Sequence, residues 1–337
     1  MPSSTSNSRD RVPESASLRI WLIGMLVGAV LLGGLEMFWR YMGHKPSVTA
    51  DATLWSVQRA KLESDDRNNI ALLGWSRSLY NMVPQEIISQ QPQVTVANLA
   101  IEGKHPYATL RDLANNESFR GLVLCDITYD ALKPKYREDQ QFRVDEFHRK
   151  WQMSKGVERR LRSEVQSRLV LVSPRTSIKQ FADGVFNDTW EWPFHMRIQH
   201  DRWWAADFHA ANFDHIIQFT MKLRRNNAKE VPVDQSVNIE GAKLFGQLVT
   251  KIQQRGGEVV FVRMPIGRHP WERKTKSAGW HLLVEHTTAK TIHFSDYPEL
   301  SKYILWDGSH IDMHDAPAFT RSVVAILVEM KVLPRPN

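Results

Sequence analysis

Two short stretches, far apart in the chain, carry side chains that together could activate a serine hydroxyl. Ser76 follows the apolar run Ile70–Leu73 and Gly74, in a pattern typical of a strand, a sharp turn and a helix start. Near the other end, Asp307 and His310 lie three residues apart in a Gly/Ser turn. A neutral imidazole can take the proton of a serine when a carboxylate holds its other nitrogen, which is the chemistry of nucleophilic acyl transfer.

Each stretch also has a simpler interpretation. A serine after a glycine is most often a turn or helix-capping residue, and an aspartate and a histidine before a helix can simply cap it and its loop. The helix predicted after His310 has Asp315 at its N-cap and Pro317 in its first turn, so His310 is expected on a loop backed by this helix.

A third block, residues 98–103, follows the predicted strand Val94–Ala97. With NIALLGWSRSLY, NLAIEG and DGSH in this order, the chain resembles the SGNH (GDSL-like) hydrolase superfamily. It is most similar to membrane-anchored, extracytoplasmic members linked to O-acylation of envelope polymers such as alginate and teichoic acid. The resemblance covers roughly residues 65–330, apart from a middle segment. It implies a catalytic triad of Ser76, His310 and Asp307, and an oxyanion hole formed by the N–H groups of Ser76 and Gly103.

Three departures from the family pattern leave a second interpretation open. Trp75 stands where the family usually has Asp, and Ala100 where it usually has an additional Gly. The strand Gly121–Ile127 contains Asp126 but not the asparagine that the family contributes to the oxyanion hole. Because a carboxylate opposes a developing oxyanion, Asp126 cannot take that role. The alternative to a serine esterase or O-acyltransferase is a catalytically inactive SGNH-like scaffold or binding component of an envelope polysaccharide assembly machine.

Four further polar residues are candidates for substrate binding near Ser76: Arg77, Asn98, Asp126 and Arg263. Arg77 could hold an anionic group of an acyl donor or glycan, or be an exposed arginine at a helix start. Arg263 ends a buried strand and could contact a substrate or form a structural ion pair. Asp126 could shape the floor of the pocket or orient a loop.

Histidines are frequent in two regions, but neither predicts a metal site. The spacing of the first group matches no metal-binding mechanism; it comprises His195, His200, Asp207, His209 and His215. The second group contains Asp312 and His314 with His310, which the triad explains better. We therefore predict no metal and no cofactor.

The elements that must position these residues alternate between strands and helices. The strands are predicted at Ile70–Leu73, Val94–Ala97, Leu122–Ile127, Glu258–Met264 and Lys290–Phe294, and the helices at Thr53–Glu63, Ser78–Ile88, Tyr107–Leu113, Asn238–Arg255 and Pro317–Lys331. This order predicts an α/β fold of three layers, α/β/α, with a doubly wound parallel sheet, as in SGNH and flavodoxin-like proteins. Ser76 would then lie at the carboxyl edge of the sheet, where such folds place their chemistry.

The N-terminal region predicts a membrane anchor. Residues 1–19 read as a disordered polar tail, and residues 20–39 as an apolar run long enough to cross a bilayer. We predict a single-pass signal anchor, with a cleaved signal peptide and a cleavage site at Val48–Ala50 as the alternative. Glu36 near its end either reaches the membrane interface or pairs with a partner helix. The family resemblance favours an extracytoplasmic, periplasmic main domain.

The remaining boundaries follow from the interruption of the alternating pattern. Residues 40–64 form a linker, 65–130 and 231–337 the two parts of the SGNH-like domain, and 131–230 an inserted helical subdomain or lid, with charged helical segments across Glu146–Arg168. Four tryptophans of the aromatic part of the insertion could stack on sugars, rest on a membrane interface or form a small core of their own; they are Trp190, Trp192, Trp203 and Trp204.

Composition limits the partners. The formal charge of +7 and the pI near 9.4 suit an anionic membrane surface or a polyanionic glycan. No nucleic-acid-binding motif accompanies the charge, so nucleic acid is not an expected partner. The single cysteine, Cys125, excludes an intramolecular disulfide. The expected partners are an acylated glycan or an acyl-donor protein of the envelope, and the sequence does not determine the oligomeric state.

Overall fold

The computed structural model describes residues 14–174, 176, 195–210, 235–267 and 279–335. The chain forms two compact units, which we describe separately. One comprises Met1–Pro46 and Arg168–Pro193, and the other Ser47–Ser167 and Phe194–Asn337. All the candidate site residues belong to the second unit.

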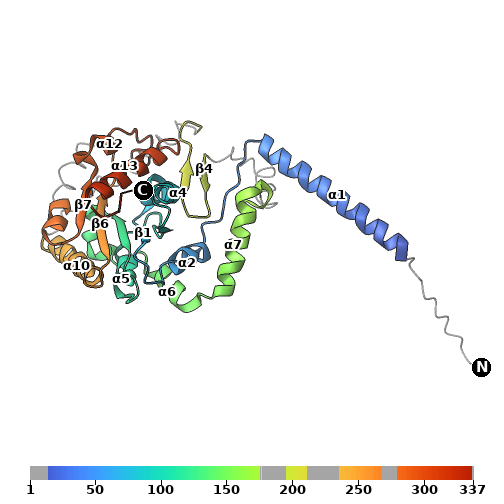
Figure 1. The fold of residues 1–337 in the computed structure, drawn as a ribbon. Coiled ribbons are helices and arrows are strands. Elements are labelled where there is room, and N and C mark those ends of the chain that lie inside the picture. Colours follow the sequence, from blue (N-terminus) through green and yellow to red (C-terminus); the bar gives the residue numbers. More distant parts are fainter. Residues whose placement is uncertain (1–13, 175, 177–194, 211–234, 268–278, 336–337) are drawn as a thin grey trace, which may run out of the picture. The chain divides into compact units, whose positions relative to one another are not determined.

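The second unit is organised around a sheet of five parallel strands in the order β2-β1-β3-β6-β7 (Figure 1). The strands are β1 (Asn69–Leu73), β2 (Thr95–Asn98), β3 (Leu122–Asp126), β6 (Glu258–Arg263) and β7 (Lys290–His293). The chain runs from β1 outward to β2 and returns to the other side of β1 at β3, so the direction of winding reverses at β1. Strands β1 and β3 are buried along their whole length, which explains the apolar runs Ile70–Leu73 and Leu122–Cys125 that make up most of each strand.

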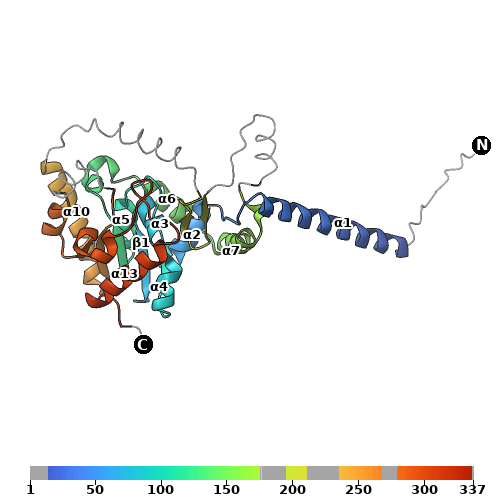
Figure 2. The same cartoon turned by 90° about the horizontal axis from the view of Figure 1, so that it is seen from above.

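Helices cover both faces of this sheet. Leu73 and Val123 point to one face and pack with Leu110 of α5 (Tyr107–Asn115) and Phe245 of α10 (Gln235–Gln254). Leu72 and Leu124 point to the other face, with α4 (Pro84–Gln90) and α13 (Ala316–Glu329). In Figure 2, β1 lies between α5 and α13. The predicted α/β fold with a parallel sheet between helices is confirmed.

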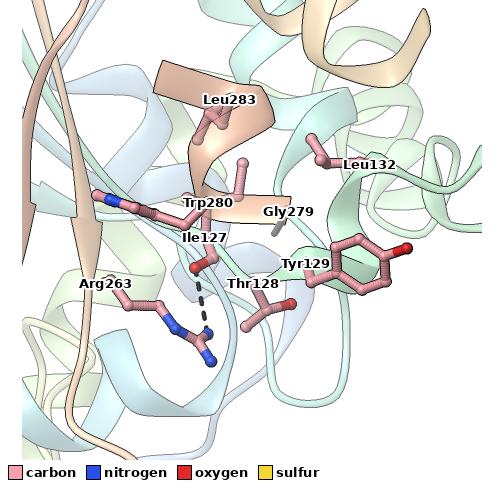
Figure 3. A pocket seen from close by; sticks show the side chains of 8 residues that line it. All are labelled: Ile127, Thr128, Tyr129, Leu132, Arg263, Gly279, Trp280 and Leu283. Carbon is pink, nitrogen blue, oxygen red and sulfur yellow. Dashed lines mark hydrogen bonds between the residues drawn. The ribbon is translucent and has the colours of Figure 1, made fainter. Parts of the chain in front are cut away.

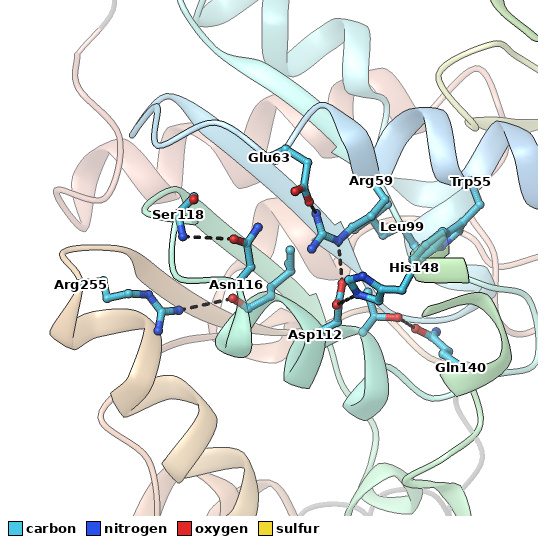
Figure 4. Close-up of polar contacts among 12 residues, drawn as sticks. Trp55, Arg59, Glu63, Leu99, Asp112, Asn116, Ser118, Gln140, His148 and Arg255 are labelled. Atoms are coloured by element: carbon cyan, nitrogen blue, oxygen red, sulfur yellow. Dashed lines mark hydrogen bonds and ion pairs between the residues drawn. The ribbon is translucent and has the colours of Figure 1, made fainter. Parts of the chain in front are cut away.

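A polar contact joins α2 (Ala52–Ala60) to the first face through α5 (Figure 4). The buried Arg59 pairs with Asp112 of α5, with 2.6 Å between Nε and Oδ2. His148 of α6 (Gln141–Lys150) lies 2.6 Å from the other oxygen of Asp112. Trp55 donates its indole N–H to the carbonyl oxygen of Leu99 at 2.9 Å. The helix predicted before β1 therefore packs against the helical layer that contains α5.

Two features differ from the sequence prediction. The prediction of a single helix over Ser78–Ile88 is wrong, because α3 (Ser76–Asn81) and α4 are separate helices. Pro84 has no N–H and holds the preceding Val83 in an extended conformation, so the first helix ends before it. An antiparallel pair, β4 (Met196–Ile198) and β5 (Trp204–Ala206), lies in the region predicted to be helical.

Apart from α7, the other described elements are short. They are α7 (Met153–Arg168), α12 (Pro298–Ser301) and the 3-10 helices η1 (Tyr129–Leu132), η2 (Pro134–Tyr136), η3 (Val170–Val172) and η4 (Phe294–Asp296). Trp203 and Trp204 are each 8% exposed, but they pack in hydrophobic clusters with residues such as Leu72 and Leu79, so they do not form a core of the insertion alone. Trp190 and Trp192 lie outside the described residues.

The first unit contains α1 (Glu14–Tyr41). Its segment Leu18–Tyr41, 24 residues with a mean hydropathy of 2.0, is long and apolar enough to cross a membrane, although a signal sequence has the same properties. The Glu36 carboxylate pairs with Arg40 at 2.7 Å and accepts the backbone N–H groups of Val170 and Leu171 at 2.9 and 2.8 Å. Glu36 thus has its partners within its own chain.

Candidate active site

The turn after β1 presents Ser76 at the carboxyl edge of the sheet, as the first residue of α3. Gly74 makes this turn possible, because its φ of +141° lies in a region that other residues rarely adopt. A Cβ on Gly74 would also lie 2.8 Å from Cβ of Asp126 on β3. Only glycine therefore fits between the two strands where Ser76 leaves the sheet.

The structure brings Ser76, His310 and Asp307 into one line of hydrogen bonds. Ser76 Oγ lies 2.8 Å from Nε2 of His310, and Nδ1 of the same ring lies 2.5 Å from Oδ2 of Asp307. The Tyr80 ring stacks on the imidazole, with 4.2 Å between centroids, and so fixes its plane. This geometry lets His310 accept the serine proton while Asp307 holds the opposite nitrogen.

Asp307 also shapes the loop that carries His310. Its Oδ1 accepts the backbone N–H groups of Ser309 and His310, each at 2.8 Å. Burial raises the pKa of the carboxyl group, but the hydrogen bonds from His310 and Ser309 outweigh burial, so the pKa of Asp307 lies below its usual value. Asp307 is therefore ionised at neutral pH and can stabilise an imidazolium.

Buried hydrogen bonds hold the loop that carries His310 against the neighbouring elements. Asn81, in the last turn of α3, accepts the N–H of Ile311 through Oδ1 at 3.0 Å. Asp312 accepts the N–H of Phe208, next to β5, through Oδ2 at 2.7 Å. No sequence pattern singles out Asn81, because a lone asparagine in a helix does not reveal a partner so distant in the chain.

Gly103 lies in a turn that is tied to the Ser76 turn. Gly103 has a φ of +65°, and the neighbouring Ile101 donates its N–H to the carbonyl oxygen of Gly74 at 3.2 Å. Gln140 donates through Nε2 to the same Gly74 oxygen at 2.9 Å and to the Lys104 oxygen at 3.0 Å. These bonds hold the two predicted oxyanion donors on adjoining turns, and the N–H of Ser76, at the start of α3, has no partner within the helix.

Asn98 and Arg202 support the start of the Gly103 loop. Asn98 is fully buried and accepts the N–H of Ala100 through Oδ1 at 3.2 Å. Arg202, between β4 and β5, donates to the carbonyl oxygens of Asn98 and Ala100 at 2.6 and 2.9 Å. Arg202 has a φ of +67°, unusual for a residue other than glycine, and no sequence pattern singled it out.

A buried group of charges lies below the Ser76 turn. Arg77 is 2% exposed, Asp126 1% and Arg263 3%. Arg77 Nε lies 3.8 Å from Oδ2 of Asp126, and its guanidinium lies over the Trp75 ring, 4.7 Å from the centroid. Burial raises the pKa of Asp126, while Arg77 and Arg263 act in the opposite direction. The interpretation of Arg77 as an exposed arginine is therefore wrong. All four side chains predicted to bind substrate are buried, namely Arg77, Asn98, Asp126 and Arg263.

His105 extends this buried region. Its ring lies against Trp75, 5.3 Å between centroids, and meets Tyr136 edge-on at 4.4 Å. Burial lowers the pKa of His105 from 6.5 to about 4, with the cations Arg77 and Lys133 acting in the same direction. The ring is therefore neutral at physiological pH.

A small cavity lies beyond the carboxyl ends of β3 and β6 (Figure 3). Its volume of about 10 Å³ suits one water molecule. Arg263, whose Nη1 donates to the Ile127 oxygen at 3.4 Å, lines it with Thr128, Tyr129 and Trp280. Neither Ser76 nor His310 belongs to its lining, so it is separate from the candidate active site.

One group of three potential metal ligands occurs in the described part of the chain. Asp207, Asp312 and His314 place one atom each within 4.8 Å of one another. Their contacts have an explanation without an ion, because Asp312 accepts both the N–H and the Nδ1 of His314, at 2.8 and 2.7 Å. Of the first histidine-rich group in the sequence, Asp207 belongs to this cluster, His195, His200 and His209 do not, and His215 lies outside the described residues.

No protein-family model matches the chain, and neither does any curated protein. Fold and site geometry therefore carry the functional assignment.

Proposed function

We propose that the chain is a membrane-anchored serine esterase or O-acyltransferase of the SGNH type, acting on acyl esters of cell-envelope glycans. One observation carries the proposal: His310 lies between Ser76 Oγ at 2.8 Å and Asp307 Oδ2 at 2.5 Å. A capping role would need neither bond, whereas an activated nucleophile needs both. The position of Ser76 after β1, in a parallel sheet between helices, is the one that the resemblance to SGNH hydrolases implies.

In the proposed reaction, Ser76 Oγ attacks the carbonyl carbon of an acyl ester. His310 Nε2 takes the hydroxyl proton, and the N–H groups of Ser76 and Gly103 stabilise the oxyanion. As the bond to the leaving alcohol breaks, His310 returns the proton to its oxygen, and the acyl group remains on Ser76. A second acceptor then attacks this ester by the same steps in reverse. Water completes a hydrolysis, and a glycan hydroxyl completes a transfer.

The first residues of the second unit support an anchor that stays attached. Val48 is 1% exposed and donates its N–H to Ile198 at 2.9 Å, and Thr49 accepts from Gln166 Nε2 at 3.0 Å. Cleavage after Ala50 would remove these residues from the fold. We therefore propose that α1 remains as a single-pass anchor, with the main unit on the periplasmic side, where it meets an acylated glycan or acyl-donor protein.

Labelling with a fluorophosphonate probe tests this proposal. The probe reacts only with a serine that has a functioning base, so the wild type is expected to be labelled, and Ser76→Ala and His310→Ala are expected to lose the label. Ser78→Ala provides a matched control, because Ser78 is a buried serine on the same helix and has no part in the proposed triad. A folded wild type that stays unlabelled would overturn the proposal.

A second candidate function has its own supporting observation. Asp126 stands where the family pattern has an oxyanion asparagine, and its carboxylate is buried beside Arg77 and offers no donor. A catalytically inactive SGNH-like scaffold or binding component of an envelope polysaccharide assembly machine would tolerate this change. For that function, the wild type would fold, remain unlabelled and still bind an envelope glycan or assembly protein.

A further inference from the structure

One side of the helix α7 exposes a stripe of large apolar side chains. Met153, Val157, Leu161 and Val165 follow one another at intervals of four residues and are 84%, 56%, 65% and 47% exposed. This spacing places them on one side of the helix. The opposite side is buried and is formed by Gly156, Arg159, Ser163 and Gln166. A stripe of this kind costs free energy in water and indicates a surface that is covered in use.

Basic side chains flank the stripe. Lys155, Arg160, Arg162 and Arg168 are all exposed, against two exposed acidic residues, Glu158 and Glu164. At 100° per residue, Arg160 falls on one side of the stripe and Lys155 and Arg162 fall on the other, while Glu164 falls within the stripe and Glu158 at its edge. Apolar residues bordered by cations are typical of helices that lie in the surface of an anionic membrane, where the cations bind lipid phosphates.

The chain itself keeps α7 near the end of α1. On the buried side of α7, Arg159 Nε lies 3.2 Å from Asp51 Oδ1, and Gln166 Nε2 donates to Thr49 Oγ1 at 3.0 Å. Thr49 follows Tyr41, the last residue of α1, closely in sequence. Since an extended chain advances at most about 3.5 Å per residue, Thr49 lies within about 30 Å of that end.

A second connection lies in the first unit. Arg168, the last residue of α7, accepts a hydrogen bond at its carbonyl oxygen from Arg40 Nη2 at 2.7 Å. Arg40 belongs to the last turn of α1. Within the first unit, Arg168 is therefore hydrogen-bonded to the last turn of α1.

We propose that α7 lies in the surface of an anionic lipid bilayer, with Val157 and Leu161 in the boundary between headgroups and acyl chains. The inference rests on the proposed role of α1 as a membrane anchor. The bilayer is the chosen occupant because α1 brings it within reach in every molecule and because the flanking cations complement its charge. As a consequence, α7 would restrain the second unit at the membrane, close to glycans and acyl donors carried there.

Fluorescence of the full-length chain in vesicles tests the proposal. Leu161→Cys and, as a matched control on the flank of the same helix, Lys155→Cys would be labelled with the dye NBD. Cys125 can stay, because it is fully buried and burial raises its thiol pKa, so the reagent does not reach a thiolate there. The vesicles contain phosphatidylcholine with phosphatidylglycerol, with or without doxyl-labelled lipid as a quencher. Carbonate extraction measures separately whether α1 is embedded.

We expect doxyl lipid to remove most of the NBD emission at position 161 and little at position 155, with less quenching at 161 in vesicles of phosphatidylcholine alone. Equal, weak quenching at both positions in a carbonate-resistant protein would overturn the inference and leave the anchor intact. Disulfide-linked dimers of Leu161→Cys without quenching would also overturn it and assign the stripe to a second copy. Extraction of the protein by carbonate would instead contradict the role of α1 as an anchor. Fluorophosphonate labelling of both variants at the wild-type level would show that the proposed active site is unaffected.

Discussion

Asn81 accepts the backbone N–H of Ile311 at 3.0 Å, and this bond joins the two segments that form the candidate active site. Asn81 ends the helix that begins with Ser76, and Ile311 directly follows His310. Thr320 of α13 adds a bond from Oγ1 to the Asn81 carbonyl oxygen at 3.1 Å. The distance between serine and histidine is therefore set by a buried frame and does not depend on the bond between them.

Removing the side chain of Asn81 should loosen this frame. Asn81→Ala leaves the buried N–H of Ile311 without its acceptor, which should lower the free energy of unfolding by about 1–3 kcal/mol. Because displacement of a catalytic group by about 1 Å can cost about 10²-fold in rate, fluorophosphonate labelling should slow by that order. Labelling time courses and denaturant unfolding in detergent measure the two effects.

Asn81→Asp separates the effect on stability from the effect on the labelling rate. It keeps an acceptor for Ile311 but buries a carboxylate, so it should be less stable than the wild type and still be labelled faster than Asn81→Ala. Asn68→Ala, at an exposed position, serves as the control. If Asn81→Ala is labelled at the wild-type rate, Asn81 does not position His310.

Replacing Asp307 should remove reactivity without unfolding the loop. In Asp307→Asn, an amide oxygen can still accept the N–H groups of Ser309 and His310, but the ring no longer has a carboxylate on Nδ1. The histidine then loses its oriented tautomer, and the labelling rate should fall on the order of 10³-fold or more. The exposed Asp296→Asn is the control. An Asp307→Asn variant with more than a tenth of the wild-type rate would argue against the triad.

Two glycine substitutions distinguish steric conflict from backbone strain. Gly74→Ala places a methyl group 2.8 Å from Cβ of Asp126 and 3.1 Å from Cβ of Ser78, at a φ of +141°. It should destabilise the fold by about 2 kcal/mol or more and abolish labelling. Gly103→Ala meets no atom within 4 Å, so only its φ of +65° opposes the change, and a cost of about 1 kcal/mol is expected. Equal melting temperatures for the two variants would contradict the close strand contact at Gly74.

The buried His105 predicts how stability depends on pH. Its folded pKa of about 4 lies below its usual 6.5, so between these values the unfolded chain binds a proton that the folded chain does not. The free energy of unfolding should therefore fall as pH falls from 6.5 to 4, by up to about 3 kcal/mol from this residue. His105→Gln should show a weaker fall between pH 7 and 5 in denaturant titrations. The exposed His281→Gln should behave like the wild type, and identical slopes for all three would refute the assignment.

The sequence predicted the sheet well because its strands are buried on both faces. Strands such as β1 and β3 have no polar alternation, and the apolar runs end where the chain leaves the sheet. Ser76 follows β1, and the Asp307–His310 pair precedes the last helix, α13. These positions in the sequence indicated that the three residues could lie close together. Only the structure gives the hydrogen-bond distances between them.

The supporting residues could not be predicted in the same way. Asn81, Gln140 and Arg202 each join segments that are far apart in the chain through one polar side chain, and a single polar residue has no periodicity. Strands β4 and β5 have three residues each, too few to show alternation. Pro84 indicates the break between α3 and α4. The residues on both sides of Pro84 nevertheless have helical spacing, which predicts one continuous helix.

The separation of 234 residues between Ser76 and His310 also bears on how the protein is made. The serine turn and most of the sheet precede the histidine in the chain, so a growing polypeptide carries Ser76 without a base for most of its synthesis. Under the proposed mechanism, the hydroxyl is during that time as inert as any other serine. Its reactivity would begin only when the last loop docks against Asn81.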